Sequence, residues 1–80
     1  MKKIKINFKQ IDRNPKYSLQ MNNKIGFYNN LRAKTTAAVD FYNSASPEER
    51  EMIYETVMSS VIKTAKWEKA LNNIIGRKFN

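Results

Sequence analysis

The sequence contains no cysteine and no histidine. Without cysteine there can be no disulfide, thiolate metal site or thiol nucleophile, and without histidine the usual general base is missing. Only two glycines occur, and they stand apart, so the sequence has no glycine-rich phosphate-binding loop. We therefore expect a protein that is not an enzyme and that needs no metal or cofactor.

Long apolar runs are missing as well. No stretch approaches the roughly 18 apolar residues of a membrane span, and no apolar run of a secretory signal follows the basic start. These features predict an intracellular, cytoplasmic protein. A chain of 80 residues makes one domain with a thin core. Because small domains without disulfides or metals are often stabilised by association, we also expect a homodimer.

Positive charge, in contrast, is in excess. The formal net charge at pH 7 is +8, with +8 on residues 1–34, −4 on residues 35–62 and +4 on residues 63–80. The chain is thus basic at both ends and acidic in the middle. Such a balance favours an acidic partner, above all a nucleic acid.

Residues 1–22 predict a β-strand or a β-hairpin. Alternation brings three apolar side chains to one face: Ile4, Ile6 and Phe8. Such alternation is typical of a half-buried strand. A turn signal at Pro15 leads to a second, shorter alternation over residues 17–22. Ser18 leaves an alternative open, in which it caps an early helix instead.

Two helices are predicted next, over residues 24–44 and 46–75. Apolar residues of the first recur at helical spacing along one stripe: Phe27, Leu31, Ala38, Tyr42 and Ala45. The second begins with a capping box, in which Ser46 and Glu49 exchange hydrogen bonds. Gly76 is expected to end it.

The apolar stripe of the second helix rotates near Lys63, by roughly 110° at 100° per residue. Either this helix bends there, or its two halves bury against different surfaces. The first half would pack on the preceding helix, and the second on the hairpin or on a partner chain. We assign the dimer interface to the second half, at Trp67, Leu71, Ile74 and Ile75.

The predicted fold class is therefore α+β. An N-terminal β-strand or hairpin over residues 1–22 is followed by two antiparallel helices, the second one long, in a single domain that spans residues 1–80. Four aromatic residues are expected in its core: Phe8, Phe27, Phe41 and Trp67.

Two groups of basic residues are candidate phosphate contacts. The first lies on the exposed face of the predicted strand and at its turn: Lys3, Lys5, Lys9, Arg13 and Lys16. The second forms an inclined row on the long helix: Lys63, Lys66 and Lys69. Any one of these residues alone is best interpreted as solvated surface. Together they favour a polyanion, because each cation placed against a phosphate releases a counterion.

As a type, the chain resembles the small accessory proteins, rich in lysine and asparagine, that tailed phages make early in infection. Within that group it is similar to the RNA-binding inhibitors that T-even-like phages use against ToxIN-type toxin–antitoxin systems. The resemblance rests on the length, on the basic ends (Met1–Lys9 and Lys63–Lys78) and on the order of strand and helices. It implies RNA binding in the host cytoplasm and inhibition of a host factor.

We therefore predict non-enzymatic binding of RNA through phosphate contacts with little sequence specificity. The alternative is a protein-binding inhibitor or adaptor that docks on an acidic host protein by a strand edge or a helix surface. Phosphate-driven binding should weaken steeply with salt, whereas docking should depend on a few apolar anchors.

Overall fold

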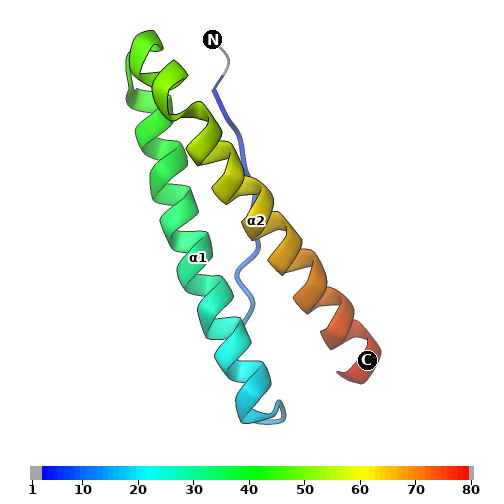
Figure 1. The fold of residues 1–80 in the computed structure, drawn as a ribbon. Helices are drawn as coiled ribbons and strands as arrows, with labels where there is room; N and C mark the ends of the chain where they lie inside the picture. Colours follow the sequence, from blue (N-terminus) through cyan, green and yellow to red (C-terminus); the bar gives the residue numbers. More distant parts are fainter. Residues whose placement is uncertain (1–2, 80) are drawn as a thin grey trace.

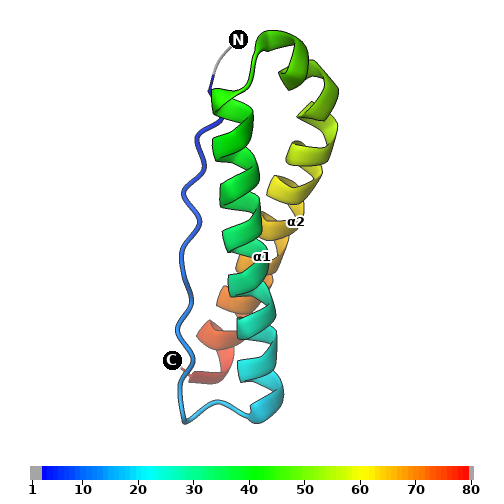
Figure 2. The ribbon, with the colours of Figure 1, turned by 90° about the vertical axis from the view of Figure 1, so that its left-hand side faces the viewer.

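The computed structural model describes residues 3–79, with side chains through residue 77, and two helices make up most of it. Helix α1 spans Leu19–Ser44 and helix α2 spans Pro47–Phe79, and they run antiparallel (Figure 1). The described residues contain no β-strand, so the predicted α+β class is wrong and the fold is all-helical. Residues 3–18, here called the N-terminal segment, run along one side of the helical pair (Figure 2).

Helix α1 begins earlier than predicted because Ser18 is its N-cap. The backbone of Ser18 is extended, and its hydroxyl accepts a hydrogen bond from the Met21 N–H at 3.1 Å. Residues 19–22, predicted as part of the second strand, therefore belong to the helix. The alternative in which Ser18 caps an early helix is confirmed, and the hairpin is wrong.

Helix α2 begins as predicted and ends later. The Glu49 N–H donates to the Ser46 hydroxyl at 3.2 Å, and the Ser46 N–H donates to the Glu49 carboxylate at 3.3 Å, which confirms the capping box. The helix then continues through Gly76 to Phe79. A glycine typically ends a helix by adopting a left-handed conformation, and no described glycine has a positive φ.

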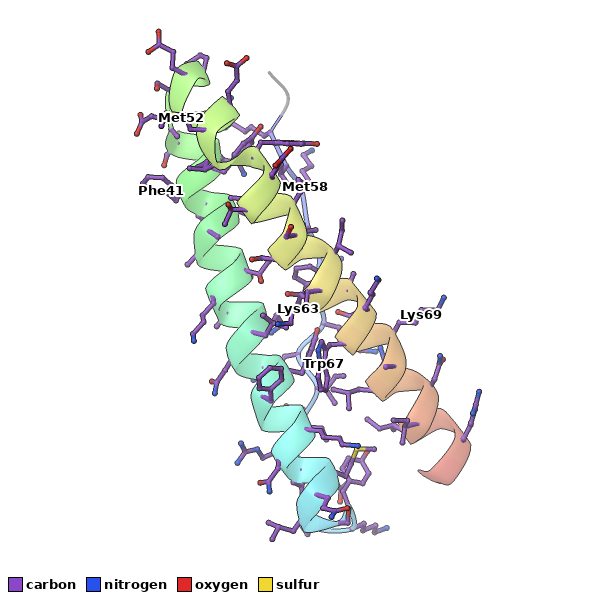
Figure 3. The ribbon with its side chains drawn as sticks, viewed as in Figure 1. Phe41, Met52, Met58, Lys63, Trp67 and Lys69 are labelled. Atoms are coloured by element: carbon purple, nitrogen blue, oxygen red, sulfur yellow. The ribbon has the colours of Figure 1, made fainter. Side chains whose placement is uncertain are left out.

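The two helices meet along a seam of residues that are seven positions apart. On α1 the buried seam residues are Met21, Tyr28, Thr35 and Tyr42, and on α2 they are Val57, Thr64 and Leu71. When two helices pack at a shallow angle, seven residues complete two turns of each helix. Side chains seven positions apart therefore lie on the face of their helix that contacts the other helix. Of the predicted stripe, Tyr42 lies on this seam and Phe27 does not. Phe27 and Phe41, both expected in the core, are 48% and 57% exposed, and Figure 3 shows Phe41 on the outer side of α1.

The core consists of two apolar clusters. The hairpin-end cluster lies at the end of the molecule where residues 45 and 46 join α1 to α2. It contains Val39, Tyr42 and Val57, with Ile4 and Ile6 packed against it. The open-end cluster lies at the other end, where the two helices are not joined, and contains Ile11, Met21, Ile25, Tyr28 and Leu71. Each cluster thus combines residues of α1, α2 and the N-terminal segment. Both halves of α2 therefore bury against α1 and the N-terminal segment, and the predicted assignment of the two halves to different surfaces is wrong for the described residues.

A buried polar pair occupies the seam between the two clusters. The hydroxyl oxygens of Thr35 and Thr64 are hydrogen-bonded at 2.8 Å, and the Thr64 hydroxyl lies 2.7 Å from the Ser60 carbonyl. Because both hydroxyls have partners, burying them does not leave the uncompensated polar groups that would destabilise the seam.

The four predicted dimer-interface residues belong to the open-end cluster of their own chain. Leu71 is 1% exposed, and Trp67, Ile74 and Ile75 are partly buried against the same cluster. Leu71 therefore has no free surface for a partner in this conformation. Dimerisation itself stays a prediction.

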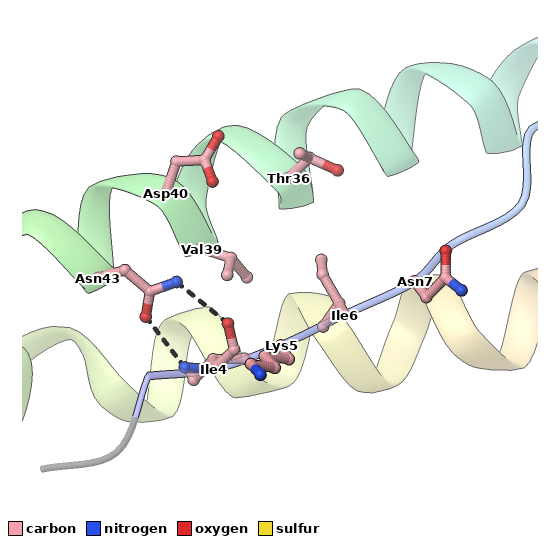
Figure 4. Close-up of a pocket in the computed structure, with 8 residues that line it drawn as sticks. All are labelled: Ile4, Lys5, Ile6, Asn7, Thr36, Val39, Asp40 and Asn43. Carbon is pink, nitrogen blue, oxygen red and sulfur yellow. Dashed lines mark hydrogen bonds between the residues drawn. The ribbon is translucent and has the colours of Figure 1, made fainter.

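Asparagine side chains of α1 hold the N-terminal segment in place. Asn43 accepts a hydrogen bond from the Ile4 N–H and donates one to the Ile4 carbonyl, both at 3.0 Å (Figure 4). Asn29 binds Ile11 in the same way, at 3.4 and 2.8 Å. Asn22 binds Asn14 likewise, at 3.2 and 3.1 Å. Each side-chain amide thus satisfies one N–H and one carbonyl, as a neighbouring strand would.

The spacing of these three clamps follows from the rise of the two backbones. The extended chain from Ile4 to Ile11 spans about 23 Å, and the helix from Asn29 to Asn43 spans about 21 Å. From Ile11 to residue 14 the segment advances about 10 Å, as does α1 between Asn22 and Asn29. Because these distances agree, asparagines of α1 that are separated by multiples of seven positions each lie beside a backbone N–H and carbonyl of the N-terminal segment.

Gly26 comes two residues after the predicted start of the first helix, but it lies inside α1, beneath the Arg13 side chain. An added Cβ would collide with the end of the Arg13 guanidinium. That end is flexible and can move aside, and alanine favours a helix interior over glycine by about 1 kcal/mol. We expect Gly26→Ala to raise the midpoint of thermal unfolding, followed by circular dichroism, by about 4–8 °C. A lower midpoint that Arg13→Ala restores would show instead that Arg13 is held rigidly.

Candidate nucleic-acid interface

All eight predicted phosphate contacts are exposed. In the N-terminal segment the predicted alternation holds although no strand forms. Lys3, Lys5 and Lys9 are exposed, and the apolar residues between them are half-buried against the helices. Alternate residues of an extended chain lie about 6.6 Å apart. The three lysines, here called the lysine row, therefore follow the outer side of the segment.

The lysine row is anchored at Lys9 through its backbone. The Lys9 N–H donates to the Glu68 carboxylate at 2.8 Å, and the Lys9 carbonyl accepts from the Tyr28 hydroxyl at 2.7 Å. The same hydroxyl lies 2.8 Å from a Glu68 carboxylate oxygen. Burial raises the pKa of Tyr28 above its usual value, and the hydrogen bond to Glu68 raises it further. Tyr28 therefore stays protonated and keeps its role as a donor at neutral pH.

Lys69 of α2 lies near the lysine row, whereas Lys63 does not. Lys69 lines a hollow of about 450 Å³ beside the N-terminal segment, together with Asn7 and Phe8. The Lys63 side chain extends from the other side of α2 than the Lys69 side chain in the view of Figure 3. Because three residues of a helix turn the side-chain direction by about 60°, the predicted row of Lys63, Lys66 and Lys69 winds around α2.

A second hollow, also of about 450 Å³, lies between the N-terminal segment and α1 (Figure 4). Lys5 lines it, and so does the carboxylate of Asp40. Ile6 and Asn7 line both hollows, so the segment forms a ridge between them. One negative charge therefore lies on the α1 side of the lysine row.

Arg13 and Lys16 lie at the bend that leads into α1. The Tyr17 N–H donates to the Asn14 carbonyl at 2.9 Å, and the Lys16 N–H donates to the Asn14 side chain at 2.9 Å, which defines this bend. From Lys3 to Arg13 an extended chain spans about 33 Å, and the molecule is 47 Å long. The predicted N-terminal contacts thus form a line along the molecule and not a compact patch.

The helices carry an exposed aromatic pair that was not predicted from the sequence. The ring centroids of Phe27 and Trp67 lie 5.0 Å apart, and the ring planes are inclined by 51°. Phe27 is 48% exposed and Trp67 is half-buried. The seven-residue spacing of the seam is the signal that could have revealed Phe27 as a surface residue, because Tyr28 and not Phe27 occupies a seam position.

Comparisons with protein-family models, with curated proteins and with solved structures found no match for this chain. Neither helix, within the described residues, has the length and apolar character needed to cross a bilayer. The resemblance to phage RNA-binding inhibitors stays a prediction. One of its three supports, a strand before the helices, is wrong for the described residues.

Proposed function

We propose that the protein binds RNA through phosphate contacts, with little sequence specificity and without catalysing a reaction. One observation carries the proposal: the lysine row is exposed along a segment whose backbone is fixed to both helices by side-chain hydrogen bonds. Because that backbone is already ordered, binding a phosphate chain does not require the entropy loss of ordering it.

Other predicted contacts extend the row at one end and flank it on one side. Arg13 and Lys16 continue it at the open end, and Lys69 lies beside it on α2. The charge of a lysine side chain is a flexible point charge, and phosphate oxygens are the same at every nucleotide. These contacts therefore hold a nucleic acid in position without distinguishing its bases, which gives low sequence specificity.

The proposal is tested by two charge-reversed variants with the same net charge. Lys5→Glu/Lys9→Glu changes the lysine row, and Lys34→Glu/Arg77→Glu changes two exposed cations outside it. Binding of a fluorescein-labelled single-stranded RNA is measured by anisotropy between 50 and 200 mM salt. We expect the first variant to bind more weakly and to lose about 1.4 from the slope of log affinity against log salt, about 0.7 for each lost contact.

The control variant should keep the wild-type slope and most of the wild-type affinity. Equal losses in both variants would mean that only net charge matters, and the lysine row would then have no special role. If the wild-type protein binds no RNA at 50 mM salt, the proposed function is wrong.

A second candidate function is supported by apolar side chains at the hairpin end. Phe41 is 57% exposed and Met52 is 83% exposed (Figure 3). Such side chains offer apolar anchors for a host protein on a helix surface, as the alternative prediction requires, but the net charge of −4 on residues 35–62 disfavours an acidic partner at this end. Docking by a strand edge is not proposed, because the described residues form no strand. Affinity purification with and without nuclease separates the two functions, since only RNA-bridged partners are lost with nuclease.

The place and outcome of binding that we propose follow from the resemblance alone. They are the cytoplasm of an infected host and inhibition of a host RNA-associated factor. Light scattering of the purified protein, with and without RNA, measures whether the binding species is the predicted homodimer.

A further inference from the structure

The aromatic pair of Phe27 and Trp67 lies on a part of the helical pair that the N-terminal segment does not cover. Trp67 lies between the two helices in Figure 3. The neighbouring Glu68 binds the backbone of Lys9 in the segment, and one residue of a helix turns the side-chain direction by about 100°. The Trp67 side chain therefore points about 100° away from the direction of Glu68. One part of the indole packs on the open-end cluster, and Phe27 packs against the ring with a centroid separation of 5.0 Å.

A small apolar hollow opens at Trp67. It has a volume of about 280 Å³, and Lys66, Trp67 and Ala70 line it. Ala70 comes three residues after Trp67, so its side chain neighbours the indole on the helix surface. Because a methyl group is small, it leaves the indole uncovered on this side. The hollow is thus bounded by an aromatic ring, a small side chain and one cation.

Cations surround this aromatic pair on both helices. Lys63 precedes Trp67 by four residues and Lys24 precedes Phe27 by three, and both are exposed. Residues three or four apart are neighbours on a helix surface. Glu68, the only acidic residue in the last 18 residues of the sequence, is engaged with Tyr28 and with the Lys9 backbone. The aromatic pair therefore lies in a basic setting.

We propose that Trp67 and Phe27 form a stacking platform for an unpaired base of single-stranded RNA, with Lys63 and Lys66 on the adjoining phosphates. This inference rests on the proposed function and adds a preference for single strands. Stacking accepts every base, because each has a π face, so it agrees with low sequence specificity.

Other occupants fit the hollow less well. A carboxylate of an acidic protein would meet the lysines but would be repelled by the negative face of the indole. A second copy of this chain would bring the same lysines against one another. A base with its phosphate satisfies both features, because the flat ring meets the indole and the charge meets the lysines.

The test uses the emission of Trp67, which is the only tryptophan in the chain. A ten-nucleotide single-stranded RNA is titrated into the protein while emission and anisotropy are recorded. We expect quenching that saturates with the dissociation constant given by anisotropy. Duplex RNA and heparin offer charge without an unpaired base, so they should bind with little quenching.

Two variants complete the test. Ala70→Leu fills the hollow at an exposed position and leaves Trp67 in place. We expect it to weaken single-stranded RNA binding about tenfold and to suppress the quenching. Trp67→Leu should weaken binding to a similar extent, with circular dichroism to confirm that it folds. Binding of heparin, which needs only the lysines, should be unchanged in Ala70→Leu.

The possible failures are distinct. If RNA binds by anisotropy but does not quench Trp67, and Ala70→Leu binds as tightly as the wild type, the stacking platform is wrong and the proposed function stands. If quenching by duplex RNA or heparin equals that by single strands, the platform is also wrong. If no RNA binds, both proposals fail together.

Discussion

Leu71→Ala is expected to lower the free energy of unfolding by about 3 kcal/mol, within the range of about 2–5 kcal/mol for a buried leucine. Leu71 is 1% exposed at the centre of the open-end cluster, where it meets side chains from α1 and from the N-terminal segment. A domain of this size has a total stability of only about 4–12 kcal/mol. One truncated side chain should therefore remove a large share of it.

The matched control is Leu19→Ala, the same substitution at a residue that is 77% exposed. It should change the free energy of unfolding by less than about 0.5 kcal/mol. Both variants are compared with the wild type by urea denaturation followed by circular dichroism. Equal, small effects at the two positions would contradict the packing of the open end and would return Leu71 to the predicted dimer interface.

The helices and their caps were largely predictable from the sequence because their signals are local. A capping box occupies four consecutive residues, and both of its hydrogen bonds are present. The start of α1 depended on Ser18, which fits a strand or a cap equally well as a residue type. The end of α2 was predicted too early because glycine permits a helix end without requiring one.

The N-terminal segment was wrongly predicted as a strand because alternation reports only that one side of an extended chain is buried. Ile4 and Ile6 are buried against helices, and side chains of α1 satisfy the backbone in place of a second strand. The sequence holds a signal for this arrangement in Asn22, Asn29 and Asn43, whose separations are multiples of seven. That signal becomes readable only when the segment is known to lie antiparallel to α1.

The stripe on α1 was partly misplaced for a related reason. It consists of apolar residues alone, yet Thr35 outside it is 1% exposed and Phe27 within it is 48% exposed. A buried threonine can be recognised only together with its partner Thr64, which is 29 residues away. Pairings between distant residues are the part of this fold that local patterns do not contain.

Within the candidate site, the exposure of the lysines was predicted correctly, but which lysines of α2 lie beside the lysine row was not. Each lysine of the row is exposed, as alternation alone implies. Whether Lys63 or Lys69 joins that row depends on which flank of α2 receives the N-terminal segment. Glu68 decides this through its hydrogen bond to the Lys9 backbone. No role for Glu68 was predicted from the sequence.

Tyr28→Phe tests this anchoring, because it removes the hydroxyl that joins α1 to the segment. The Lys9 carbonyl loses its donor, and Glu68 loses one of its partners. We expect the free energy of unfolding at pH 7 to fall by about 1–3 kcal/mol. Tyr54→Phe is the control, since this ring is 45% exposed, and it should change stability by less than about 0.5 kcal/mol.

The Tyr28 hydroxyl also makes stability depend on alkaline pH. An unfolded tyrosine loses its proton near pH 10, whereas burial and Glu68 hold the pKa of Tyr28 higher in the folded protein. Above about pH 10 the folded state therefore binds more protons than the unfolded state. The contribution of Tyr28 to the free energy of unfolding then falls by at most about 1.4 kcal/mol per pH unit. Below about pH 10 this contribution is present in full.

The difference in unfolding free energy between the wild type and Tyr28→Phe should consequently shrink from pH 9 to pH 11. Urea denaturation of both proteins at several pH values measures this difference, and the titration of lysines cancels because both proteins contain the same ones. A difference that stays constant over this range would mean that Tyr28 titrates as it does in the unfolded chain. The clamp around Lys9 would then be too weak to fix the position of the lysine row.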